Sequence, residues 1–175
     1  MKPNSTLKLT GLLAAFSLAS TLFAAAPPAR AGSPTDADTA GYLSQKASGL
    51  LAEIHQNAQR VLKSADTLDE YNREAFMIDW RADALTLDSM KGQINKIDQT
   101  VNQLRAMEAN LPQAQQSEIN QLAPAAAELT NNAQLAIDFL NTNRDRTMFP
   151  PYTSYADEMY TEAARIVRST APSRS

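Results

Sequence analysis

The chain has 175 residues, a formal net charge of −3 and no cysteine. Without cysteine, disulfide bonds, covalently attached haem and a lipid-modified N-terminal cysteine are excluded, so the fold must rest on an apolar core. The acidic balance argues against nucleic acid as a partner, because binding to a phosphate backbone requires clustered Lys and Arg.

Residues 1–31 have the layout of a secretory signal peptide. Two lysines precede an apolar run over residues 11–26, and the small residues Ala29 and Ala31 suit a cleavage site after Ala31. The apolar run is shorter than the roughly 20 residues that span a bilayer. We therefore expect one mature domain, residues 32–175, exported to the periplasm or secreted, without an integral membrane segment. The alternative is an uncleaved N-terminal anchor.

The next segment predicts a helix over about residues 36–70. Ser33 or Thr35 is a suitable N-cap, and Pro34 is tolerated at a first-turn position. Apolar residues then alternate at intervals of three and four, which indicates a helix with one narrow apolar seam. The seam consists of Ala47, Leu51, Ile54, Ala58, Val61, Ala65 and Leu68.

A second helix is predicted over about residues 79–110 with the same rhythm. Gly92 falls on the solvated side, where it costs about 1 kcal/mol relative to Ala without harming the packing. Asn110 and Pro112 are suited to end the helix. Its seam consists of Trp80, Leu87, Met90, Ile94, Ile97, Val101 and Leu104.

The third helix, over about residues 113–143, contains a proline. Pro124 removes a backbone hydrogen bond and clashes one turn back, at about 3 kcal/mol if nothing relaxes, so we expect a kink or a restarted helix there. The seam continues through it and is rich in small residues, which suits packing against the larger seam of the second helix. It consists of Ile119, Leu122, Ala126, Leu129, Ala133, Ala136 and Leu140.

A shorter fourth helix is predicted over about residues 153–169. The pair Pro150-Pro151 indicates a turn before it, and Ser154 is the expected cap. Acidic residues fill its first half and basic residues its second half, which complements the helix dipole. Its buried face is expected to contain Tyr155, Ala156, Met159, Ala163, Ile166 and Val167.

These elements predict an all-α protein. Three long amphipathic helices and a shorter one, joined by short turns, pack economically as an antiparallel up-down four-helix bundle. The third helix would be kinked near Pro124. The rival fold is an elongated coiled coil that completes its core by dimerising.

Residues for a metal site or for catalysis are scarce, so we expect no cofactor, no metal and no enzymatic activity. The single histidine, His55, cannot supply the paired Glu-x-x-His motifs of di-iron bundles. Non-covalent haem between His55 and one of several methionines stays open, but His55 follows the seam residue Ile54 and is expected to face solvent. Acidic pairs such as Asp79 and Asp83 are expected to be structural, because acids favour helix starts.

One group of side chains could bind a partner. Phe149, Tyr152 and Tyr155 crowd the turn before the last helix, and antiparallel packing would bring them to the same end as Trp80. Aromatic residues near arginines are typical of binding hot spots. The competing interpretation is that these rings seal one end of the bundle.

Two functions remain open. The first is a non-enzymatic exported bundle that contacts a protein or an envelope component through this aromatic patch. The alternative is a carrier of a small apolar ligand in the bundle core, where the alanines of the third helix would leave room.

Overall fold

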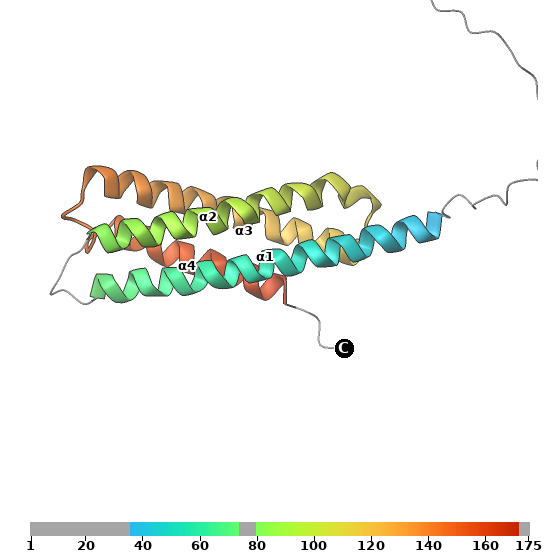
Figure 1. Ribbon diagram of the computed structural model, residues 1–175, viewed down its shortest axis with the longest axis horizontal. Helices are drawn as coiled ribbons and strands as arrows, with labels where there is room; N and C mark the ends of the chain where they lie inside the picture. Colours follow the sequence, from blue (N-terminus) through green and yellow to red (C-terminus); the bar gives the residue numbers. More distant parts are fainter. Residues whose placement is uncertain (1–35, 74–79, 172–175) are drawn as a thin grey trace, which may run out of the picture. The chain divides into compact units, whose positions relative to one another are not determined.

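The computed structural model describes residues 36–73 and 80–171. The expected signal peptide, the caps at Ser33 and Thr35, and Asp79 lie outside these residues. Four α-helices follow one another along the chain (Figure 1). They are α1 (Asp36–Arg73), α2 (Trp80–Met107), α3 (Gln113–Thr142) and α4 (Tyr152–Ser169), with a short 3-10 turn, η1 (Glu108–Asn110), after α2. No strand occurs within the described ranges, so the predicted all-α class is confirmed.

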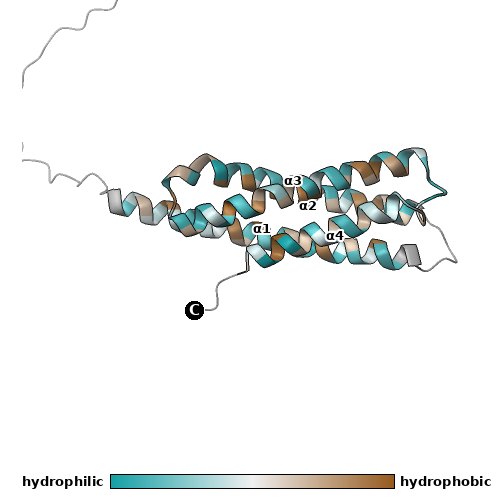
Figure 2. Ribbon diagram, turned by 180° about the vertical axis from the view of Figure 1, so that it is seen from behind, coloured by the Kyte–Doolittle hydropathy of each residue, from teal (hydrophilic) through white to brown (hydrophobic). Residues whose placement is uncertain are grey.

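The helices form a four-membered ring around one core. α1 packs against α2 and α4, and α3 packs against the same two helices. Hydrophobic and hydrophilic stretches alternate along each helix (Figure 2). Every residue of the predicted α1 and α3 seams is buried, and so is each α2 seam residue from Leu87 to Leu104, while Trp80 is only partly buried. Burial of these seams is the main source of stability in a chain without disulfides.

α3 continues through Pro124 as one helix, so the restart that we gave as an alternative to a kink does not occur. Pro124 and Asn120, whose carbonyl loses its helical partner, are both exposed. Solvent can therefore satisfy that carbonyl, which lowers the cost of an interior proline. The apolar seam passes on the opposite side, where Ala123, Ala125 and Ala126 are buried.

The expected cap of the last helix is wrong. α4 begins at Tyr152, with Pro151 at the N-cap position and no side-chain capping bond. Ser154 lies inside the first turn and is exposed. The earlier start matters because it turns Tyr152 towards the core, where its exposed fraction is 1%.

α4 is much shorter than its neighbours. It has 18 residues, whereas α1 has 38 and α3 has 30. At 1.5 Å per residue, α4 is about 27 Å long and α1 about 57 Å. Thr170, which follows α4, contacts His55 in the middle of α1. α4 therefore ends beside His55, and the first half of α1 extends past this end.

None of the described helices combines the length and the apolar character needed to span a bilayer.

Two neighbouring leucines on α2 provide a direct test of the core. Leu87 is 2% exposed and Leu85 is 74% exposed. We expect Leu87→Ala to lower the free energy of unfolding by about 2–5 kcal/mol, because it removes buried methyl groups and leaves a cavity. Leu85→Ala is the matched control and should change it by less than about 0.5 kcal/mol. Urea denaturation measures both, and equal losses would contradict this assignment of the core.

Candidate functional site

The first candidate site surrounds Trp80, at the start of α2. The Trp80 ring is partly buried against the core. The Cζ atom of Arg144, from the segment after α3, lies 4.4 Å from the ring centroid, and that of Arg81 lies 4.9 Å from it. Guanidinium groups at these distances are attracted to the negative face of the indole. The tryptophan thereby connects α2 with the segment that joins α3 to α4.

The predicted aromatic patch is divided between surface and interior. Phe149 is 54% exposed, whereas Tyr152 is buried and Tyr155 is half-buried against the core. The Tyr152 ring packs against Phe139 of α3, with 6.0 Å between the ring centroids and an interplanar angle of 33°. The exposed part of the patch thus consists of Phe149, the accessible part of Trp80 and the neighbouring Arg144.

Tyr152 and Asp83 bring polar groups into this end of the core. Asp83, in the first turn of α2, is 4% exposed. The Tyr152 hydroxyl is buried and has no hydrogen-bond partner among the described residues. Burial raises the pKa of the Tyr152 phenol far above its ordinary value, and the nearby Asp83 carboxylate raises it further. Tyr152 therefore stays neutral and serves as a core residue rather than as a binding contact.

A second candidate site is the cleft where α4 ends. It has a volume of about 440 Å³ and lies between α1, α3 and the C-terminal end of α4. α1 contributes Ser48, Leu51, Ala52, His55 and Gln56, α3 contributes Gln115 and Glu118, and the end of α4 contributes Ser169, Thr170 and Ala171. Because α4 stops here, no helix fills the space between α1 and α3 beyond Ala171 within the described residues.

His55 differs from the expected solvated histidine. It is half-buried, and its Nδ1 lies 3.0 Å from the Thr170 hydroxyl oxygen while its Nε2 lies 3.0 Å from the Gln59 amide nitrogen. Thr170 donates its own proton to the carbonyl of Ile166 at 2.7 Å. The hydroxyl must therefore accept from His55 Nδ1–H, and Nε2 accepts from the Gln59 amide. This network assigns the Nδ1–H tautomer and occupies both ring nitrogens.

Gln115 holds the starts of α1 and α3 together on the other side of the cleft. Its amide nitrogen donates to the carbonyl of Ser44 at 3.0 Å and to the hydroxyl of Ser48 at 3.1 Å. A carbonyl can only accept, so the orientation of the Gln115 amide is fixed. Its Oε1 is buried without a hydrogen-bond partner among the described residues.

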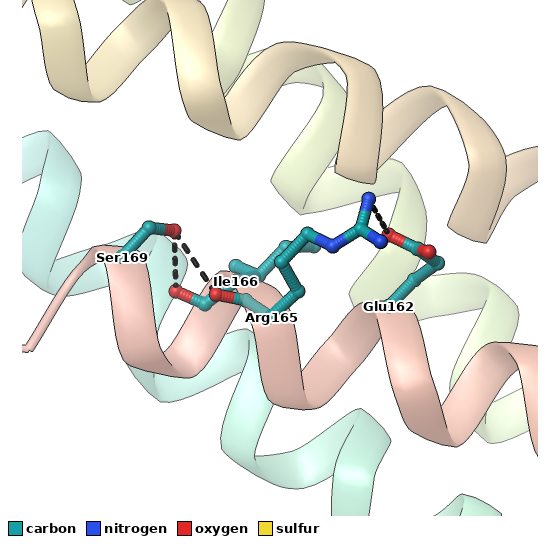
Figure 3. Close-up of polar contacts among 4 residues, drawn as sticks. All are labelled: Glu162, Arg165, Ile166 and Ser169. Carbon is teal, nitrogen blue, oxygen red and sulfur yellow. Dashed lines mark hydrogen bonds and ion pairs between the residues drawn. The ribbon is translucent and has the colours of Figure 1, made fainter.

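Side chains near the end of α4 make polar contacts within their own helix (Figure 3). Of these residues, Ser169 lines the cleft. The Ser169 hydroxyl donates to the carbonyls of Arg165 and Ile166, both at 3.1 Å. One turn earlier, Arg165 pairs with the buried carboxylate of Glu162 at 3.2 Å. The Ser169 hydroxyl proton is therefore used within α4, and the lone pairs of its oxygen remain available to accept other hydrogen bonds.

Potential metal ligands do not gather in the described part of the chain. No group of three or more His, Asp or Glu side chains lies close enough there to hold a metal ion. Both ring nitrogens of His55 are engaged. The alanine seam of α3 is packed within the core cluster. The cleft lies at the surface instead, and it was not predicted from the sequence.

No protein-family model, curated protein or solved structure matches this chain.

The buried phenol predicts a specific response to alkaline pH. In the unfolded chain Tyr152 ionises near its ordinary pKa of about 10, whereas in the folded chain it keeps its proton at higher pH. Above about pH 10 the unfolded state binds fewer protons, so the free energy of unfolding falls as pH rises. We expect Tyr152→Phe to reduce this fall, as measured by urea denaturation at several pH values.

The control for this experiment is Tyr160→Phe, because Tyr160 is 43% exposed. Its alkaline stability profile should match that of the unmodified protein. If Tyr152→Phe has the same profile too, the Tyr152 phenol does not have the raised pKa that its burial implies.

Proposed function

We propose that the protein is an exported, non-enzymatic helical bundle that binds another protein or an envelope component through the Trp80 end. The observation that carries this proposal is the stacking of the exposed Arg144 on the Trp80 ring at 4.4 Å, beside a segment that exposes Phe149. Stacking fixes a long cationic side chain before any partner arrives, which lowers the entropy lost on binding. Tryptophan and arginine also dominate binding hot spots.

The charges favour a partner with acidic groups. Arg144 and Arg146 flank Asp145, and all three are exposed in the segment between α3 and α4, so this segment carries a net positive charge on a chain whose net charge is −3. Guanidinium groups bind carboxylates with two parallel hydrogen bonds, and Phe149 offers apolar area beside them. The partner surface should therefore combine a carboxylate with an apolar or aromatic neighbour.

The topology that we infer is the antiparallel up-down arrangement. Three contacts support it: Gln115 near the start of α3 meets Ser44 near the start of α1, Arg144 after α3 meets Trp80 at the start of α2, and Thr170 after α4 meets His55. In this arrangement the Trp80 end and the cleft lie at different positions along the bundle. We also propose that α3 bends at Pro124, because an interior proline removes one backbone hydrogen bond of the helix.

Export is supported by the two early lysines, the apolar run over residues 11–26 and the small residues Ala29 and Ala31. We expect the mature chain to begin at Gly32, because the signal peptidase would cut after Ala31. The intact mass of the protein purified from its own host measures this. A mass equal to that of the full chain would overturn the assignment of a cleaved signal peptide.

The binding proposal is tested first by crosslinking. A photoreactive amino acid placed at Phe149 should yield an adduct with one main partner in the native host, identified by mass, whereas the same probe at Tyr160 should not. Tyr160 is a suitable control position because it is also exposed, on α4. Equal adducts at both positions, or none at position 149, would contradict the proposal.

Substitutions then test the chemistry with the purified partner. We expect Arg144→Ala and Phe149→Ala each to weaken binding about tenfold or more, as removal of a hot-spot residue does. Both residues are exposed, so the urea midpoint should change little. Arg168→Ala is a control of equal charge change on exposed α4 surface. If it weakens binding as much as Arg144→Ala, only the net charge matters and the Trp80 end is not the contact.

A further inference from the structure

The cleft at the end of α4 has an unusual hydrogen-bonding character. Three of its hydroxyl groups have already donated their protons to backbone carbonyls: Ser48 to Ser44, Ser169 to Arg165 and Ile166, and Thr170 to Ile166. Each hydroxyl oxygen therefore presents only lone pairs to a ligand. Ser48 and Thr170 each already accept one hydrogen bond, from Gln115 and His55, so one lone pair remains on each of these oxygens. The cleft thus offers hydrogen-bond acceptors from α1 and from the end of α4.

The nitrogen atoms that line the cleft leave few hydrogen-bond donors free for a ligand. The Nδ1–H of His55 is used by Thr170, and the amide nitrogen of Gln115 is used by Ser44 and Ser48. Gln56 is the remaining lining residue with an amide donor, and it is exposed. A ligand that only accepts hydrogen bonds would thus meet few donors here, whereas a ligand with several donors would meet many acceptors.

The electrostatic features of the cleft point in the same direction. Glu118 lines it, is half-buried and has no ion pair or hydrogen bond with another described residue. α4 ends at Ser169, so the negative end of its dipole and its last free carbonyls lie at this wall. A carboxylate and a helix C-terminus both favour a cation.

The remaining lining is apolar. Leu51, Ala52 and Ala171 contribute hydrocarbon surface, and the volume of about 440 Å³ is within the usual range for small-molecule sites. We propose that this cleft binds a small amphipathic primary amine. Its ammonium group would donate to Glu118 and to the hydroxyl oxygens of Ser48 and Ser169, and its hydrocarbon part would cover Leu51 and Ala52. The site is independent of the Trp80 end and of any protein partner.

Hexylamine is the first probe, with hexanol and hexanoate as probes of equal chain length. Titration followed by amide NMR should give saturable shifts for hexylamine, centred on residues that line the cleft. Hexanol lacks the charge and hexanoate carries the opposite charge, so both should bind at least about tenfold more weakly, as expected for the loss of a charged hydrogen bond.

Two variants locate the site. Glu118→Gln should weaken hexylamine binding about tenfold while the fold is retained, because a half-buried surface carboxylate is removed isosterically. Its matched control is Glu128→Gln, an exposed position on the same helix, which should leave binding unchanged. Ala52→Leu should also block binding, by filling the cleft from an exposed position on α1.

The proposal is overturned if hexylamine causes no saturable shifts. It is also overturned if hexanol or hexanoate binds as tightly as hexylamine, or if Glu128→Gln weakens binding as much as Glu118→Gln. In that last case, general attraction to an acidic protein would explain the binding. Urea denaturation of each variant shows whether a loss of binding reflects a loss of folding.

Discussion

The structure depends on the burial of four apolar seams in one interior. A chain without cysteine has no covalent bond to replace this burial, and every predicted seam residue of α1 and α3 is removed from solvent. The four helices differ in length, however, and α4 ends beside His55 while α1 and α3 continue. Because α4 is too short to cover the full length of α1 and α3, an open cleft remains between them at the end of α4.

The seams could be predicted from the sequence because their 3-4 spacing is a local property of each helix. The same spacing is present in α4 and begins at the first residue of that helix, before the expected cap. Tyr152, Ala156, Met159, Ala163 and Ile166 follow one another at intervals of four, three, four and three, and all are buried. Taking Ser154 as the cap excluded Tyr152 from this series and assigned it to a surface patch. A capping residue is weaker evidence than a continuous apolar seam.

Other features depend on contacts between distant segments, which periodicity does not report. His55 was expected to face solvent because it is offset from its own seam, but that offset turns it towards the end of α4, where Thr170 meets it. From the sequence, the arginines before the last helix are only neighbours of aromatic residues, whereas the position of Arg144 over Trp80 depends on how the segment after α3 folds back. The cleft could not be derived either, since it results from the length of one helix relative to two others.

We propose that recognition occurs at the margins of the bundle, whereas the core has a structural role. All four helices should then share one cooperative interior. Urea unfolding followed both by far-ultraviolet circular dichroism and by the fluorescence of Trp80, the only tryptophan, tests this most directly. A shared interior predicts one transition with the same midpoint by both probes. Loss of Trp80 fluorescence at a clearly lower urea concentration than loss of helix would show separate folding units and contradict it.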